Sequence, residues 1–325
     1  MTASPDAPFA PTAPLTPSTS PAPLVPPRPP ALDLLVRVGC RLVYEATTTA
    51  TLLLTVRPRT EMRQALRQEL LSFGEELPSE ELVDGEGNVV HRVALPPGRH
   101  EIRTDALVAV SRLADRHDLV DATPSPPQAL PPELLRFTLP SRYCDSDKLV
   151  NFAWQHFGQV PHGLPRVLAM CAWLHANIEY RYGSGSPELS AWDVLQRRFG
   201  VCRDFAHTLI ALCRTFNLPA RYVSGHLPDI GFPDPENHMD FHAYSEVYLG
   251  GRWHTFDARF AVPRIGRIKV ASGLDAVGGA FSTIYGGATL TWFEVWAYQV
   301  ARGSVSVGDP IDLTKRLDNR WEVLG

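Results

Sequence analysis

The sequence has no uninterrupted run of eighteen or more apolar residues. A helix that crosses a membrane needs about twenty predominantly apolar residues in a row, so this absence excludes a spanning helix. An excess of charge of one sign is also missing. The 31 lysines and arginines nearly balance the 35 aspartates and glutamates, for a formal net charge of −4. This balance gives no basic patch for nucleic acid or for an anionic membrane surface, so we expect neither as a partner.

Cysteine is scarce, and its pattern does not suggest disulfides. The five cysteines are Cys40, Cys144, Cys171, Cys202 and Cys213. They are odd in number, widely scattered and without a C-x-x-C pair, which favours free thiols in a reducing compartment. The first residues also lack the basic start and apolar block of a secretory signal. We therefore expect a cytoplasmic protein.

Composition along the chain predicts four parts. Residues 1–30 contain eleven prolines and little to bury, which predicts a disordered, partly polyproline tail. Residues 31–122 hold several short apolar runs between turn signals and predict a β-sandwich domain. Prolines dominate the start of residues 123–139, which we interpret as a linker without helix. Residues 140–325 then form a second domain, which the chain is long enough to support.

Within these parts, several elements are predicted from local pattern. The polar residues 59–81 predict a loop with a helical turn. Helices are expected over residues 146–157, with Asp145 or Ser146 as cap, over 165–183, and from Ser190, where Ser190 and Asp193 have the spacing of a capping box. The apolar run 290–300 predicts a strand that closes the sheet of the second domain.

Cys202 stands at the head of a further predicted helix. Gly200 ends the element before it, and apolar residues recur at helical spacing from Phe205 to Phe216. The unpaired N–H groups and the positive dipole end at a helix start favour a thiolate, which is the nucleophilic form of cysteine. The position therefore predicts a nucleophile, although a cysteine at a helix start is on its own more often a packing residue.

The segment 241–260 predicts a β-hairpin closed by Gly250 and Gly251. A two-residue turn at these glycines pairs positions whose numbers sum to 501. Because side chains alternate along a strand, His242 and Asp257 then lie on one face as diagonal neighbours. A carboxylate there can hold the imidazole in one tautomer while the other ring nitrogen takes the thiol proton. Cys202, His242 and Asp257 thus form a predicted catalytic triad.

Four histidines could suggest a metal site instead: His226, His238, His242 and His254. Metal ligands must converge at fixed spacing, preferably with cysteine or carboxylate partners, and these residues lack that pattern. The chain also shows no acidic calcium-binding loop. We expect neither a metal nor another cofactor.

The strings GVCRDFAH, LPARYVSG, MDFHAYSEVYLGGRWHTFDAR and PRIGRI resemble the transglutaminase-like superfamily. More narrowly, they are similar to its bacterial transglutaminase-like cysteine peptidases, over residues 140–298. The resemblance implies a papain-like α+β core of helices packed on an antiparallel sheet, preceded by a β-rich domain. By residue, it maps the nucleophile onto Cys202, the base onto His242 and the orienting acid onto Asp257.

The implied reaction is acyl transfer on peptide or carboxamide bonds through a thioester, with hydrolysis favoured by the resemblance. Transfer to an amine, as in a transglutaminase, and a non-catalytic interaction protein that keeps the fold both stay open. The backbone N–H of Cys202 is one expected oxyanion donor, and Tyr180, Tyr182 and Trp192 are the candidates for a second. We expect a protein or peptide substrate, and the β-sandwich can serve as a docking module for a protein partner.

Overall fold

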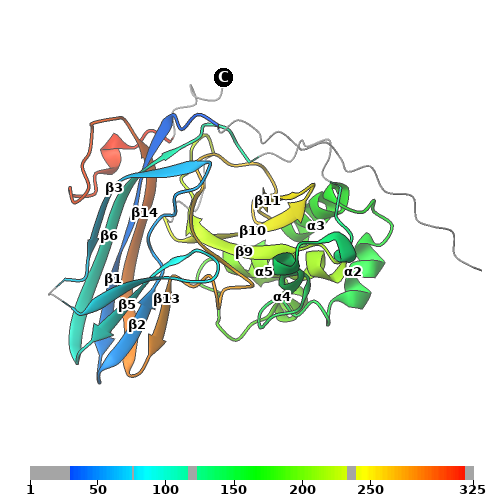
Figure 1. The fold of residues 1–325 in the computed structure, drawn as a ribbon, viewed down its shortest axis with the longest axis horizontal. Coiled ribbons are helices and arrows are strands. Elements are labelled where there is room, and N and C mark those ends of the chain that lie inside the picture. The colour runs from blue at the N-terminus through cyan, green and yellow to red at the C-terminus, as the bar shows by residue number, and fades with distance from the viewer. Residues whose placement is uncertain (1–29, 75–76, 116–122, 233–238, 319–325) are drawn as a thin grey trace, which may run out of the picture.

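The computed structural model describes residues 30–74, 77–115, 123–232 and 239–318. Strands gather at one end of the molecule and helices at the other (Figure 1). The fold combines helices with mainly antiparallel sheets, which confirms the predicted α+β class. The predicted proline-rich tail lies outside the described residues, apart from Pro30. In the part of the chain that the structure describes, none of the helices has the length and hydropathy that crossing a membrane requires.

Two four-stranded sheets face each other in the strand-rich region. The outer sheet has the order β14-β1-β6-β3 and the second sheet has the order β13-β2-β5-β4. Fully buried apolar side chains such as Leu42, Leu52 and Val93 fill the space between them. The strands are β1 (Leu34–Ala46), β2 (Ala50–Leu54), β3 (Gln64–Ser72), β4 (Ser79–Val83), β5 (Val89–Leu95), β6 (Gly98–Val110), β13 (Ser282–Tyr285) and β14 (Ala288–Val300).

The placement of β14 corrects one prediction. This strand does not close the sheet of the second domain. It pairs with β1, from Leu35 opposite Val300 to Ala46 opposite Ala288, while β13 pairs with β2. Apolar alternation identifies a strand but carries no information about which sheet the strand joins. We use "strand-rich region" below for residues 30–115 together with β13 and β14.

Two further predictions fail for local reasons. Residues 59–81 are not a loop, because they contain β3 and the start of β4, whose polar and exposed side chains hide the strand pattern. The proline-rich linker contains three short helical turns, at Pro127–Ala129, Pro132–Leu135 (α1) and Arg136–Thr138. Proline opens the first two turns, where a missing N–H costs nothing and a fixed φ suits the helix.

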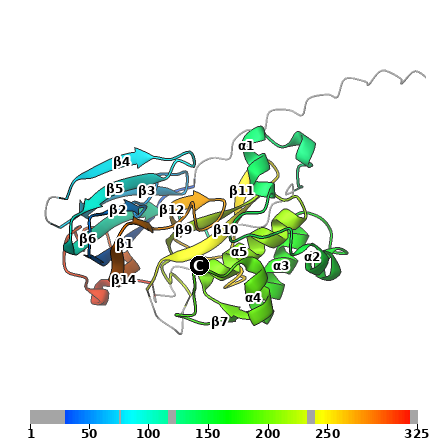
Figure 2. The same cartoon turned by 90° about the horizontal axis from the view of Figure 1, so that it is seen from below.

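The α+β core consists of a four-stranded antiparallel sheet, in the order β11-β10-β9-β12, covered by helices. Helix α5 packs against β10 and β9, and α2, α3 and α4 surround it. Seen from below, the helices lie on one side of this sheet and the strand-rich region lies on the other (Figure 2). The elements are α2 (Val150–Phe157), α3 (Leu164–Asn177), β7 (Glu179–Tyr180), α4 (Ala191–Arg197), β8 (Phe199–Gly200), α5 (Cys202–Thr215), β9 (Ala220–His226), β10 (His242–Leu249), β11 (Arg252–Phe256) and β12 (Ile268–Gly273).

A capping box marks the start of α4, whereas α2 begins without a side-chain cap. The predicted box at α4 is present, since the N–H of Ser190 donates to Asp193 at 2.9 Å. Asp145 does not cap α2 as expected. Its carboxylate accepts the N–H of Trp192 at 3.1 Å and the hydroxyl of Ser190 at 2.8 Å. Asp145 thus caps α4, and helix α2 begins later than predicted, at Val150.

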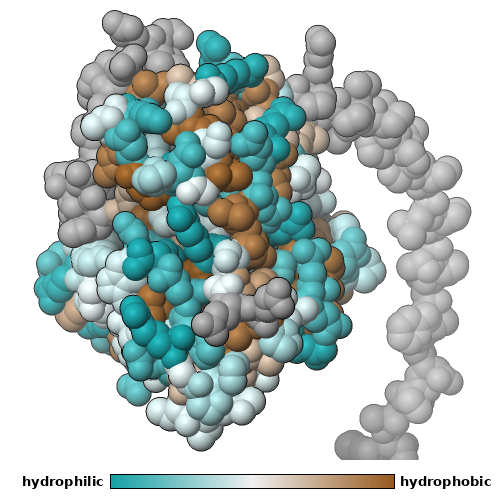
Figure 3. Space-filling model, turned by 90° about the vertical axis from the view of Figure 1, so that its left-hand side faces the viewer, coloured by the Kyte–Doolittle hydropathy of each residue, from teal (hydrophilic) through white to brown (hydrophobic). Residues whose placement is uncertain are grey.

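The strand-rich region and the core share an apolar interface. Ile230, Ile265 and Ile268 of the core side pack with Val36 and Val38 of β1 in one buried cluster. The outer face of the strand-rich region is different, because hydrophilic and hydrophobic residues are interleaved over it (Figure 3). Burial of apolar area against the core therefore holds the two parts together.

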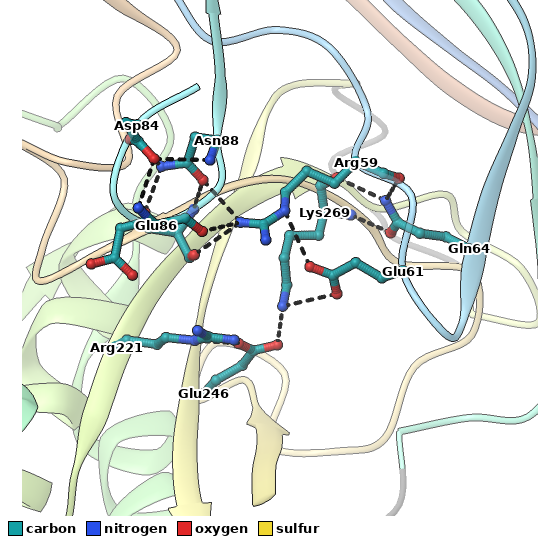
Figure 4. Close-up of polar contacts among 10 residues, drawn as sticks. Arg59, Glu61, Gln64, Asp84, Glu86, Asn88, Arg221, Glu246 and Lys269 are labelled. Carbon is teal, nitrogen blue, oxygen red and sulfur yellow. Dashed lines mark hydrogen bonds and ion pairs between the residues drawn. The ribbon is translucent and has the colours of Figure 1, made fainter. Parts of the chain in front are cut away.

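A polar network crosses the same interface (Figure 4). Lys269 of β12 is 5% exposed and pairs with Glu246 at 2.6 Å and with Glu61 at 3.2 Å. Glu246 also pairs with Arg221, at 2.6 Å. Glu246 therefore bridges Lys269 and Arg221. Glu61 lies just before β3, so this network links the core sheet to the strand-rich region.

Candidate active site

Cys202 is the first residue of α5, as the sequence predicts. The helix start is fixed by Asp204, which is fully buried. Its Oδ2 accepts the N–H of Val201 at 3.0 Å and a guanidinium N–H of Arg197 at 2.8 Å. Asp204 therefore acts as a cap that places Cys202 at the end of the helix, with its own backbone N–H among those that no helical carbonyl can pair.

The β10–β11 hairpin has the predicted register. Leu249 lies opposite Arg252 and Ser245 lies opposite Phe256, so each pair sums to 501. Gly250 and Gly251 have φ of 56° and 81°, the left-handed conformation that a tight hairpin turn needs and that glycine adopts without strain. The ladder ends at Phe256, and Asp257 is the next residue after β11.

His242 and Asp257 meet as the register predicts. His242 Nε2 lies 2.7 Å from Asp257 Oδ2, and both side chains are more than nine-tenths buried. An ionised carboxylate can only accept a hydrogen bond, so Nε2 carries the proton of the neutral ring. This assignment leaves Nδ1 as the basic nitrogen of His242.

Burial and neighbouring charge decide the protonation states of this pair. Burial lowers the pKa of His242 below the ordinary histidine value, and the charge of Asp257 opposes this shift only in part. For Asp257, burial alone would raise the pKa, but the interactions of the carboxylate with His242 and with the charged Arg267 hold it well below the usual range. Asp257 is thus ionised and His242 is neutral near neutral pH.

The thiol of Cys202 differs from the sequence expectation in its charge. Burial raises its pKa to about 11, and the backbone N–H of Ala243 lowers it too little to compensate. The thiol is therefore protonated near neutral pH in the resting protein, because desolvation disfavours its charged form. The sulfur lies 3.9 Å from the carbonyl oxygen of Phe241, the residue before His242. A base is needed to remove its proton.

Cys202 and His242 line one small pocket with a cavity volume of about 30 Å³, which is room for about one water molecule. It lies between the core and the strand-rich region, since Ala297 of β14 forms part of its wall. The lining residues are Tyr180, Cys202, Leu227, Asp229, Met239, Asp240, Phe241, His242, Arg259, Phe260 and Ala297. The structure therefore brings the predicted nucleophile and base to one pocket, with the predicted acid behind the base.

Of the three tyrosine and tryptophan candidates for a second oxyanion donor, Tyr180 lines the pocket. Its ring is covered by the guanidinium of Arg259, 3.6 Å from the ring centroid. Tyr182 and Trp192 are 46% and 37% exposed. Tyr180 is thus the candidate that the geometry favours.

The sequence did not predict two residues, Arg267 and Asp115, that lie behind His242 and Asp257. Arg267 Nη1 forms an ion pair with Asp257 Oδ2 at 2.9 Å, and Arg267 Nε donates to Asp115 Oδ2 at 2.7 Å. Arg267 belongs to the string PRIGRI, which contributed to the family resemblance but was given no role. No local spacing connects positions 115, 257 and 267, so only the fold reveals the contact.

The histidines considered for a metal are apart or engaged elsewhere. His254 Nε2 lies 3.0 Å from the carbonyl oxygen of Leu249, and the ring of His226 packs on Phe241 with centroids 5.2 Å apart. His238 lies outside the described residues. Within the described ranges, no group of three or more His, Cys, Asp or Glu side chains is arranged to hold a metal ion.

The chain is similar to known proteins both in sequence and in structure. A sequence model of the family described as the transglutaminase-like superfamily matches residues 153–258, which include Cys202, His242 and Asp257. A crystal structure of a candidate cysteine protease from Cytophaga hutchinsonii is similar, with a TM-score of 0.75 and 31% identity over 84% of this chain and 92% of that one. An uncharacterized protein of Mycobacterium leprae is 24% identical over 220 residues, which cover 65% of this chain and 78% of its own length.

The solved structure matches nearly its whole length, so the likeness includes the strand-rich region as well as the core. The family match covers the helix that begins at Cys202 and the hairpin that carries His242. On these grounds, the chain belongs to the transglutaminase-like superfamily.

Proposed function

We propose that the protein is a cysteine-dependent peptidase or amidase that cleaves peptide or carboxamide bonds through a thioester. Membership of the superfamily and the likeness to a candidate cysteine protease support cysteine-based catalysis in general. The observation that carries the proposal is the bond between His242 Nε2 and Asp257 Oδ2 beside the pocket that Cys202 lines. Cys202, His242 and Asp257 are the proposed nucleophile, base and orienting acid.

In the proposed first step, the thiol proton passes to Nδ1 of His242 as the sulfur attacks the substrate carbonyl carbon. The neutral resting states of both groups fit this order, because the proton moves only when the substrate is in place. Asp257 stabilises the imidazolium that forms. The backbone N–H of Cys202 at the start of α5 and the side chain of Tyr180 are the proposed donors to the oxyanion.

In the proposed second step, His242 gives its proton to the departing amine or ammonia and the thioester remains. Water activated by His242 then attacks the thioester, and Cys202 regains its proton as the acid product leaves. A primary amine in place of water would give transamidation by the same intermediate. The reaction with and without an added amine therefore separates hydrolase from transferase.

The same reasoning supports the remaining features of the proposal. A small pocket that opens on a nucleophile suits a peptide or side-chain carboxamide, so we propose a protein or peptide substrate. All five cysteines are free, which supports a reducing compartment such as the cytoplasm. For the domains, we propose the division predicted from sequence with one change, namely that β13 and β14 belong to the strand-rich domain.

The test compares the native protein with Cys202→Ala on a peptide mixture, with cleavage, ammonia release and incorporation of a fluorescent primary amine measured in parallel. Cys40→Ala is the matched control, because Cys40 is fully buried in the sandwich. We expect cleavage or ammonia release by the native protein and by Cys40→Ala, and a loss of about 10⁴-fold or more in Cys202→Ala. Amine incorporation would identify a transferase. Equal activity in all three proteins would contradict cysteine catalysis.

A further inference from the structure

Arg267 lies between two buried carboxylates. Its Nε donates to Asp115 Oδ2 at 2.7 Å, and its Nη1 lies 2.9 Å from Asp257 Oδ2. The side chains of Arg267, Asp115 and Asp257 are 6%, 8% and 3% exposed. Ion pairs at this depth are screened little by water or salt, so removal of one partner leaves a buried charge without compensation.

Asp115 holds the segment that carries Arg267. It follows β6 in the strand-rich region, and its N–H donates to the carbonyl of Arg264 at 2.9 Å. Its Oδ2 accepts the N–H of Arg264 at 3.2 Å as well as Nε of Arg267. The guanidinium of Arg267 also lies over the ring of Tyr244, 4.7 Å from the centroid. Backbone and side-chain contacts together fix the position of Arg267.

Asp257 is held by donors on both oxygens. Its Oδ2 contacts His242 Nε2 and Arg267 Nη1, and its Oδ1 accepts the backbone N–H of Arg259 at 3.1 Å. Opposite a neutral imidazole, a carboxylate buried this deeply would gain from taking up a proton. A protonated Asp257 could donate to Nε2 instead of accepting from it, and the tautomer with a basic Nδ1 would no longer be enforced. The permanent charge of Arg267 prevents this.

We propose that Arg267, anchored by Asp115, is a positioning residue that keeps Asp257 ionised and directed at His242. The strand-rich region then supports the active site directly, through one carboxylate. The activity part of this inference rests on the proposed function, whereas the electrostatic part does not. We call the four side chains in this line of contacts the row, in the order Asp115, Arg267, Asp257 and His242. Their charges alternate in sign once the imidazole is protonated.

Other groups also face His242 and enter any pH dependence. Arg259 and the ring of Phe260 follow Asp257, with the Phe260 centroid 5.6 Å from the imidazole. Cys202 faces it from α5 across the pocket, and Asp240 and Asp229 line the same pocket.

Tyr244 lies two residues along β10, with its ring 6.4 Å from the imidazole. Asp229 is paired with Arg264 at 3.1 Å and Arg316 at 2.9 Å, which reduces its effect. Arg267 contacts both Asp257 and Asp115, so substitutions at Arg267 and Asp115 act on the proposed row.

The test is a histidine titration by NMR in the Cys202→Ala protein, which needs no substrate. Carbon-13 labelled imidazole reports the pKa of His242, and its signal is identified as the one lost in His242→Gln. We expect the imidazole signal of Arg267→Gln to titrate about one unit higher, because the positive charge that opposes proton uptake by the Asp257–His242 pair is removed. Arg267→Lys keeps the charge and should restore most of the original value.

Asp115→Asn tests whether the pKa of His242 changes in the opposite direction when a negative charge is removed. It also provides a test if Arg267→Gln does not fold. It removes a negative charge and leaves Arg267 to act on Asp257 alone, so the pKa of His242 should fall. Arg37→Gln, in a buried pair of the outer sheet, is the matched control and should leave this pKa unchanged. A residue that only stabilises the fold would lower the melting temperature without moving the pKa. Unchanged pKa values in the Arg267 and Asp115 variants would overturn the proposal.

An activity arm separates this proposal from the proposed function. If the native protein is active, the acid limb of kcat/KM should move upward in Arg267→Gln by the same shift as the NMR pKa. If the native protein shows no activity but the pKa moves as expected, the proposed function fails and the electrostatic role of Arg267 holds. If the native protein is active and neither value moves, the positioning role fails alone.

Discussion

The buried ion pair Arg37–Asp105 of the outer sheet and the row from Asp115 to His242 behind the pocket differ in how completely their polar atoms are bonded. Arg37 and Asp105 are both fully buried, and their two contacts measure 3.0 and 2.6 Å. Arg37 also donates to the hydroxyl of Tyr298 and to the carbonyls of Asp309 and Pro310. The carboxylate accepts further hydrogen bonds from Trp296 and Gly308.

The row behind the pocket is less complete. Both terminal nitrogens of Arg267 are buried without a partner in hydrogen-bond geometry among the described residues, although Nη1 is in ion-pair contact with Asp257. The row ends in His242, whose imidazole can take up and release a proton. The fully bonded pair therefore connects β1 and β6 with the segment after β14, whereas the row behind the pocket ends in a side chain that can gain or lose a proton.

The largest expected effect is a loss of activity on substitution of Asp257, in the row behind the pocket. Asp257→Asn replaces an acceptor by an amide that can donate to Nε2, which favours the tautomer with a protonated Nδ1. That ring cannot accept the thiol proton, so we expect kcat/KM to fall by about 10⁴-fold. Steady-state kinetics on the best peptide substrate measure it. Asp105→Asn is the matched control, and a similar loss in the control would show that the effect is one of folding.

A substitution in the fully bonded pair Arg37–Asp105 should lower the stability of the fold and leave activity unchanged. Arg37→Gln leaves Asp105 buried without its counter-charge, so the free energy of unfolding should fall by about 3–5 kcal/mol. Urea denaturation measures this change, while kcat/KM of the remaining folded protein should stay the same. The distinction between the two clusters fails if Arg37→Gln lowers kcat/KM at constant folded fraction.

A smaller effect is expected at the interface network of Figure 4. Burial raises the pKa of Glu246, but the charges of Lys269 and Arg221 outweigh burial and lower it to about 2. The native carboxylate therefore stays charged at pH values where the unfolded chain takes up a proton. The ionised Glu246 makes its full contribution to the free energy of unfolding above the ordinary glutamate pKa of about 4.5. This contribution has an upper limit of about 3 kcal/mol and is lost as pH falls toward about 2.

Glu246→Gln should thus flatten the fall of the unfolding free energy between about pH 5 and about pH 2. Denaturant titrations over this range measure the slope. Glu101→Gln is the control, because Glu101 forms an exposed pair with Arg41 and should leave the slope unchanged. A wild-type slope in Glu246→Gln would mean that other carboxylates dominate acid unfolding.

Local chemistry made much of the core predictable. A glycine pair fixed the turn of the β10–β11 hairpin, and the alternation of side chains then placed His242 and Asp257 on one face. A capping box marked α4, and the apolar spacing after Cys202 marked α5. In each case, the signal lies within about twenty residues, so short-range sterics and hydrogen bonding decide the outcome.

Long-range pairing was not predictable in the same way. β14 joins β1 across more than two hundred residues, and its apolar pattern would suit either sheet. Arg267 depends on Asp115, which is 152 positions away. The protonation state of Cys202 could not be predicted from the sequence either, because desolvation of the thiol depends on the residues that pack around it. These features follow from tertiary packing, which a single sequence does not encode at fixed spacing.

The central claim, that His242 is the base for Cys202, can be tested without a substrate. Iodoacetamide alkylation of Cys202, followed by mass spectrometry over a pH series, compares native protein with His242→Gln, and the four buried cysteines are an internal reference. Near neutral pH, we predict that native Cys202 reacts about a hundredfold faster than in His242→Gln, with a rate that rises as His242 loses its proton. Equal rates at every pH would contradict the claim.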